Sequence, residues 1–107
     1  MPTATLNGTV LAEADEADVL HIEGNVYFPP SSVKSEYLVE SPTPYTCPWK
    51  GECQYFSVKD PSTGSGQAAQ LLQDRAWSYP HPYPTAFDRV GKDFSDYVAF
   101  WKEVQVS

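Results

Sequence analysis

Two short turn signals in the first 28 residues constrain the fold of this chain most strongly. Asn7-Gly8 lies inside an apolar run from Thr3 to Ala14, and Gly24-Asn25 separates Val19–Ile22 from Val26–Phe28. Asn-Gly adopts the positive φ angles of a tight hairpin turn with little strain, and a glycine also suits the first central position of such a turn. The sequence therefore predicts two β-hairpins in this region, and hence antiparallel pairing.

A third hairpin is predicted from Tyr45 to Val58, a run of β-forming residues interrupted by Trp49-Lys50-Gly51. A three-residue loop with glycine last fits a type I turn followed by a bulge. With this loop, Cys47 faces Cys53 across the two strands. With a two-residue loop, Cys47 faces Gln54 instead, and the sequence leaves both registers open.

Prolines restrict where helices can form. The segment Trp77–Pro84 has proline at every second position from 80 to 84, which holds it extended and excludes helix. Pro29-Pro30 ends the second hairpin because proline donates no hydrogen bond to a strand partner. A short helical turn is expected at Val33–Leu38, and Ser41–Pro44 is expected to be an extended connector.

The stretch from Asp60 to Gln67 is the most linker-like part of the chain, because it is rich in glycine, serine and proline. We expect a surface loop insertion over residues 60–75, with one or two helical turns between Gln67 and Arg75. Such a loop either covers a neighbouring pocket or decorates the surface.

Near the C-terminal end, apolar residues at positions 87, 90, 94 and 97 recur at helical spacing, and Thr85 with Asp88 resembles a capping box. A short amphipathic helix is therefore predicted, with Gly91 weakening its middle. Alternation from Val98 to Val106, broken at Lys102, predicts a closing strand.

Together these elements predict a mainly β fold. The 107 residues fit a single domain over 1–107. We expect a compact antiparallel sheet, or a small open barrel of hairpins, with one or two short helices near the C-terminal end.

Charge excludes several classes of partner. The formal net charge is −7, and residues 1 to 28 hold five acidic side chains and no lysine or arginine. A protein without a basic stripe does not bind a nucleic-acid backbone, and an acidic protein avoids anionic membranes. The chain has no apolar run of membrane-spanning length and no signal-peptide pattern at its start. We therefore expect a cytoplasmic protein that binds neither nucleic acid nor membrane.

Metal and cofactor signals are weak. Cys47 and Cys53 lack the close ligand pairing of a zinc site, and His21 and His81 are the only histidines that could complete one. The acidic stretch at residues 15–18 is expected to be a solvated connector rather than a magnesium site. We therefore predict no metal, and no motif identifies a cofactor.

Five blocks of sequence resemble a known family. The chain is similar to the domain-of-unknown-function family 427 (DUF427), a family also described as nucleotidyltransferase-like, and the resemblance implies a compact, mainly antiparallel β domain. A nucleotidyltransferase needs a Gly-Ser turn and paired carboxylates for magnesium. Here Gly64-Ser65 has no Asp-x-Asp after it. The blocks that carry the resemblance are Glu23–Asn25, Tyr27–Pro30, Cys47–Gly51, Ala76–Pro80 and Tyr97–Trp101.

The candidate site combines the third hairpin with the proline-rich strip. Their aromatic residues, Tyr83 among them, either form the wall of a small-ligand pocket, oriented by polar neighbours, or build the core between the two segments. Lys50 is either the main ligand contact or a solvated turn residue. Cys47 is a reactive thiol activated by Lys50, a buried hydrophobe, or one half of a strained cross-strand disulfide with Cys53. His81 is held at the surface between prolines, where it could titrate near neutral pH. The ligand-binding candidates are Cys47, Trp49, Lys50, Glu52, Tyr55, Trp77, Tyr79 and His81.

The leading functional prediction is small-ligand binding at this aromatic, lysine-containing surface. One alternative is an enzyme that handles a nucleotide or other phosphate-bearing metabolite, with Lys50 and Arg75 or Arg89 supplying positive charge. Another is a homodimeric protein-interaction scaffold. A pocket that converges on Lys50 favours the first prediction, and a flat, solvated hairpin favours the scaffold.

Overall fold

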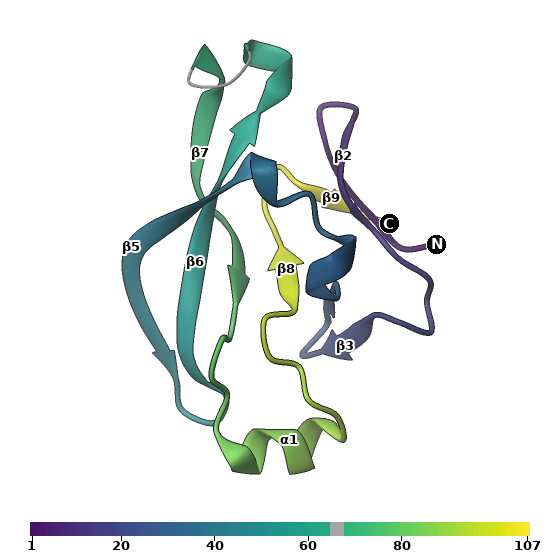
Figure 1. Cartoon of the computed structure of the whole chain (residues 1–107), viewed down its shortest axis with the longest axis vertical. Coiled ribbons are helices and arrows are strands. Elements are labelled where there is room, and N and C mark those ends of the chain that lie inside the picture. Colours follow the sequence, from purple (N-terminus) through teal and green to yellow (C-terminus); the bar gives the residue numbers. More distant parts are fainter. Residues whose placement is uncertain (65–67) are drawn as a thin grey trace.

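The computed structural model describes residues 1–64 and 68–107 and is mainly β, as predicted (Figure 1). Short 3₁₀ turns span Pro30–Ser32, Ser35–Tyr37 and Pro61–Thr63. The helix α1 spans Pro84–Val90. The strands are β1 (Thr3–Leu6), β2 (Thr9–Glu13), β3 (Leu20–Ile22), β4 (Asn25–Tyr27), β5 (Leu38–Cys47), β6 (Gly51–Asp60), β7 (Gln70–Ser78), β8 (Val98–Phe100) and β9 (Gln105–Val106).

The first hairpin is confirmed. Strands β1 and β2 are joined by Asn7-Gly8, whose φ angles of 48° and 86° are both positive, as a tight hairpin turn requires. Strand β9 pairs with the other side of β1, which gives a three-stranded sheet in the order β2-β1-β9. The first and last strands of the chain therefore lie side by side (Figure 1).

The second hairpin forms, but its predicted turn is wrong by one residue. Ile22 pairs with Asn25, so the turn consists of Glu23-Gly24 rather than Gly24-Asn25. Both turn residues have positive φ, 53° and 80°, which matches the twist of the flanking strands. The side chain of Glu23 consequently projects from the tip of the hairpin, while Asn25 begins β4.

The other sheet has the order β5-β6-β7-β8 and is antiparallel throughout. The predicted connector Ser41–Pro44 is instead part of β5, where the register is irregular between Glu40 and Pro44. Strand β5 lies at the edge of this sheet, so the N–H groups that its prolines lack are not needed by an outer neighbour.

The helical turns predicted over 67–75 are wrong, because Gln70–Ser78 forms β7 and pairs with β6. The predicted loop insertion over 60–75 is therefore restricted to the connection between Asp60 and Gln70. Part of the predicted loop, residues 65–67, lies outside the described residues. Pairing with a long neighbouring strand outweighs the weak helical preference of this segment.

Both predicted registers of the third hairpin are wrong. Cys47 pairs with Gly51, and Cys53 pairs with Tyr45, so the loop is Pro48-Trp49-Lys50. Gly51, with φ of 118°, is thus the first residue of β6 rather than the last residue of the loop. The two thiols are free, and they lie two strand positions apart on the same face.

The helical and final strand predictions need correction at their ends. Helix α1 stops at Val90, because Gly91 takes the left-handed conformation (φ 86°) and caps it rather than weakening its middle. No side chain caps its start, where Pro84 occupies the first turn.

The closing strand divides at Lys102, which has φ of 60°, into β8 and β9 of different sheets. The helical turn predicted at Val33–Leu38 is present as a shorter 3₁₀ turn at Ser35–Tyr37.

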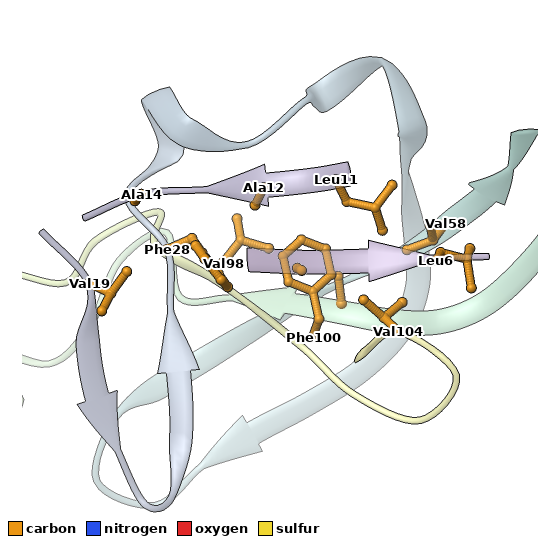
Figure 2. Close-up of a cluster of buried hydrophobic side chains, with 12 residues drawn as sticks. Leu6, Leu11, Ala12, Ala14, Val19, Phe28, Val58, Val98, Phe100 and Val104 are labelled. Atoms are coloured by element: carbon orange, nitrogen blue, oxygen red, sulfur yellow. The ribbon is translucent and has the colours of Figure 1, made fainter. Parts of the chain in front are cut away.

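Two buried clusters stabilise these sheets. The first lies between the three-stranded sheet and β6, β7 and β8, where the rings of Phe28 and Phe100 meet edge to face at 5.9 Å (Figure 2). Phe28 also exchanges backbone hydrogen bonds of 2.8 and 2.9 Å with Val98, which attaches the β3–β4 hairpin to β8. The second cluster packs the other face of β7 against α1 and contains Trp77 and Tyr79.

No helix in the described parts of the chain is long and apolar enough to cross a membrane.

Candidate functional site

An aromatic pocket of about 170 Å³ opens over β6, β7 and the β3–β4 hairpin. Tyr55 pairs with Trp77 across β6 and β7, and Trp77 pairs with Ala99 on β8, so the sheet presents one continuous face to the pocket. The hairpin packs against this face because Phe28 is bonded to Val98. The lining residues are Asn25, Tyr27, Tyr45, Lys50, Tyr55, Trp77, Tyr79 and Trp101.

Hydrogen bonds fix three of the aromatic rings of this pocket, those of Tyr27, Trp77 and Trp101. The Trp77 indole N–H donates to the Tyr27 hydroxyl at 3.0 Å, and the two rings meet edge to face at 6.2 Å. The Trp101 ring lies 5.4 Å from that of Trp77, and its indole N–H donates to the Asp74 carbonyl at 2.6 Å. Asp74 lies in a bulge of β7 and has φ of 58°, so an irregular strand position determines where Trp101 is held.

Lys50 is the charged residue of the pocket lining, and its side chain is only 6% exposed. Its Nζ donates a hydrogen bond to Glu23 Oε1 and lies 5.0 Å from the ring centre of Trp49 and 5.2 Å from that of Tyr79. Burial lowers the pKa of Lys50, but the bond to Glu23 and the acidic groups around the ammonium, the Glu23 carboxylate among them, together outweigh burial and raise this pKa overall. Lys50 is therefore an ammonium at neutral pH.

Glu23 is the exposed member of this ion pair, with 52% of its side chain exposed. The hydrogen bond from Lys50 is the main cause that lowers the pKa of Glu23, and the charge of Arg89 contributes in the same direction. The guanidinium of Arg89 lies 4.4 Å from the ring centre of Trp49. A second cation is thus stacked on the tryptophan that Lys50 also contacts.

The backbone of the third hairpin is fixed by the proline-rich strip. The Tyr83 N–H donates to the Lys50 carbonyl at 3.0 Å. A Cβ atom at Gly51 would lie 3.3 Å from the His81 carbonyl oxygen, so glycine permits this close approach. The two segments that the sequence predicted as neighbours are therefore in contact.

Burial makes three tyrosine hydroxyls and the Cys53 thiol still harder to ionise than they are in water. Burial is the main cause that raises the pKa of Tyr27, Tyr55 and Tyr79, so their hydroxyls stay protonated at neutral pH. Burial also raises the pKa of Cys53 from 9.0 to about 11. The hydroxyls therefore both donate and accept hydrogen bonds, and Cys53 is not a reactive thiolate.

The family model of the domain of unknown function DUF427 matches residues 3–107. The chain belongs to this family. No curated protein matches the chain. The blocks that carry the resemblance to DUF427 meet at the aromatic pocket, because each of the five contributes a lining residue. Those residues are Asn25, Tyr27, Lys50, Trp77, Tyr79 and Trp101.

The predicted site residues of this DUF427 chain fall into three groups. Lys50, Tyr55, Trp77 and Tyr79 line the aromatic pocket, and Trp49 contacts the Lys50 ammonium from beside it. Cys47 is buried in the cluster beneath, where it packs as a small apolar residue. Two candidates, Glu52 and His81, line a separate depression of about 290 Å³ together with Cys53, Gln54 and Pro80.

Sequence reasoning missed four lining residues and the partner of Lys50. Tyr27, Asn25 and Trp101 belong to the blocks that resemble DUF427, which was the available signal for them. Tyr45 begins the predicted third hairpin and was not chosen. Glu23 was missed because its position at the turn tip depends on the one-residue shift of the second hairpin.

Other charged candidates lie away from the pocket. Glu16 is 2.6 Å from His21, and Asp15 and Asp18 line a broad depression at the protein's acidic end. Within residues 1–64 and 68–107, no three His, Cys, Asp or Glu side chains are arranged to hold a metal ion. Arg75 is paired with Glu103 at 2.7 Å, so its charge is already compensated.

Proposed function

We propose that this DUF427 domain binds a small organic molecule with a single ring in its aromatic pocket, with Lys50 as the principal polar contact. The observation that carries this proposal is the convergence of six aromatic rings on one pocket that also contains a buried ammonium. Mostly aromatic walls with a few placed polar groups are typical of small-ligand sites. Three of the six rings, those of Tyr27, Trp77 and Trp101, are already held in place by hydrogen bonds within the protein, which reduces the ordering required when a ligand binds.

The size of the pocket supports a single ring. A cavity of about 150 Å³ holds one benzene molecule, whereas drug-sized ligands occupy pockets of about 300–1,000 Å³. The volume here is about 170 Å³. Tyr45 and Trp101 are 47% and 38% exposed, so substituents of a bound ring can extend past them into solvent.

The polar groups of the pocket favour a ligand with a hydrogen-bond acceptor. The ammonium of Lys50 donates only, while the tyrosine hydroxyls and the amide of Asn25 both donate and accept. A ring that carries a carbonyl, carboxylate or similar group fits this set.

The nucleotide alternative has less support. A nucleoside triphosphate is much larger than the pocket and needs several uncompensated positive charges. Lys50 and Arg75 are both paired with carboxylates. The scaffold alternative rests on exposed aromatic residues. Two of these, Tyr45 and Trp101, line the pocket, so ligand binding accounts for their exposure without a protein partner.

Titration followed by NMR tests the proposal. The probes are benzamide, phenol, benzoate and, for comparison, magnesium ATP. We expect the single-ring probes to shift the indole N–H signals of Trp77 and Trp101 with dissociation constants of about 1 mM or below. Magnesium ATP should leave these signals unchanged.

A matched pair of variants locates the binding. Tyr55→Leu, in the pocket wall, should weaken binding of the single-ring probes several-fold. Tyr83→Leu changes an exposed tyrosine outside the pocket lining and should leave the affinity for these probes unchanged. Absence of any indole shift with all three single-ring probes, up to their solubility limits, would refute the proposed function.

A further inference from the structure

We infer that the ligand is a carboxylate, and that Glu23 is an exchangeable counterion which this carboxylate displaces from Lys50. The inference rests on the proposed function and identifies the chemical class of the ligand. It is carried by the geometry of the Lys50–Glu23 pair, whose two members differ in burial, position and available partners.

The difference in burial decides which member can leave. The side chain of Lys50 is 6% exposed and that of Glu23 is 52% exposed. A buried ammonium without an anion is costly, whereas a half-exposed carboxylate regains water when it is released. Lys50 therefore keeps an anionic partner at all times, and Glu23 is the member that can be replaced.

The two residues also have different positions relative to the pocket. Lys50 lines the pocket, and Glu23 reaches its ammonium from the tip of the β3–β4 hairpin without lining the pocket itself. An ammonium has three hydrogen-bond donors. The same Nζ is therefore in reach of Glu23 on the outside and of a bound ligand on the inside.

A second partner is available to Glu23 once it leaves Lys50. The guanidinium of Arg89 is held on the ring of Trp49, 4.4 Å from its centre, and its charge already acts on Glu23. Glu23 therefore stays under the influence of a second positive charge after it is released from Lys50. No charge is left uncompensated in the exchanged state, since the ligand carboxylate neutralises Lys50.

This arrangement discriminates between ligands by charge. A neutral ring leaves the Lys50–Glu23 pair in place and gains only the aromatic contacts. A cationic ring is repelled by the Lys50 ammonium beside it. A ring with a carboxylate combines aromatic contacts with a charge-assisted hydrogen bond, which is about twice as strong as a neutral one.

Benzoate and benzamide, which have the same shape and differ in charge, test the inference with the variant Glu23→Gln. Removing the competing carboxylate should tighten binding of benzoate by about tenfold or more, the range of a hydrogen bond to a charged group. Binding of benzamide should change by less than twofold. Lys50→Met should abolish the preference for benzoate over benzamide.

Glu36→Gln is the matched control, because it removes the same charge from an exposed site outside the pocket. It should leave both affinities within twofold of the wild type. Unchanged indole N–H positions in the free Glu23→Gln protein show that the pocket is intact. If that variant is unstable, Glu23→Asn provides the same test with a residue that tolerates positive φ.

The outcomes separate the two proposals. If both probes bind the wild type but Glu23→Gln leaves benzoate affinity unchanged or weaker, Glu23 is not a competing counterion and only this inference fails. If benzoate, benzamide and phenol all fail to bind the wild type and the variants, the proposed function fails as well.

Discussion

Replacing Tyr27 by phenylalanine should cost about 2 kcal/mol of unfolding free energy. The change deletes one hydroxyl and leaves the Trp77 indole N–H, now bonded to it at 3.0 Å, without an acceptor. The two residues are only 1% and 9% exposed, so water replaces the lost partner poorly. An orphaned buried donor costs about 1–3 kcal/mol, and the ring itself is retained, so no large cavity adds to this range.

Urea unfolding followed by far-UV circular dichroism measures this loss. With a slope of about 2 kcal/mol per M for a domain of this size, the midpoint should fall by about 1 M. Tyr83→Phe removes the hydroxyl of a tyrosine that is 42% exposed and should stay within about 0.5 kcal/mol of the wild type.

A double-mutant cycle with Trp77→Phe isolates the hydrogen bond, because each single variant breaks it. The coupling energy should be about 1–2 kcal/mol. A loss below about 0.5 kcal/mol for Tyr27→Phe would show that this bond does not hold the pocket wall, and the reasoning above would be wrong.

Two further predictions concern the third hairpin. Gly51→Ala should lower the free energy of unfolding, measured with urea, more than Gly8→Ala does. Both glycines have positive φ, but only a Cβ at Gly51 would meet backbone atoms, with the His81 carbonyl oxygen at 3.3 Å. Equal losses of unfolding free energy in the two variants would mean that the proline-rich strip moves away from the added Cβ at little cost. The raised pKa of Cys53 stabilises the folded state below pH 9, and this contribution should be lost as the pH rises towards about 11, since the unfolded thiol ionises first. Cys53→Ala should flatten the fall in stability over that window, and an unchanged profile would contradict the burial of the thiol.

The fold was predictable from the sequence where local chemistry alone decides it. Asn7-Gly8 sets its turn because both residues tolerate positive φ, and the same logic located the second hairpin to within one residue. That one residue was not predictable, since Glu23 has no special preference for positive φ. The strand at Gln70–Ser78 was missed for a different reason. Its pairing with β6 is a tertiary interaction that overrides local preference.

The candidate site was predictable only where its residues belong to segments that the sequence itself indicates are neighbours. Tyr55, Trp77 and Tyr79 come from two segments whose neighbourhood the sequence indicated, and they do line the pocket. Tyr27 reaches it because Phe28 pairs with Val98, a contact between residues 70 positions apart in the sequence. Trp101 reaches it because its backbone N–H and its indole N–H are bonded to the carbonyls of Arg75 and Asp74 on β7. Contacts between residues so far apart along the chain leave no pattern in the local sequence.

The prolines of β5 bear on how copies of this domain meet one another. An exposed sheet edge offers a row of free N–H and C=O groups, which is a template for aggregation and for dimers built by joining sheets. Pro42 and Pro44 remove two N–H groups from this edge and coincide with its irregular register. Neighbouring molecules therefore find a broken row of donors along the outer side of the four-stranded sheet. This edge favours molecules that remain separate over molecules that extend one another's sheets.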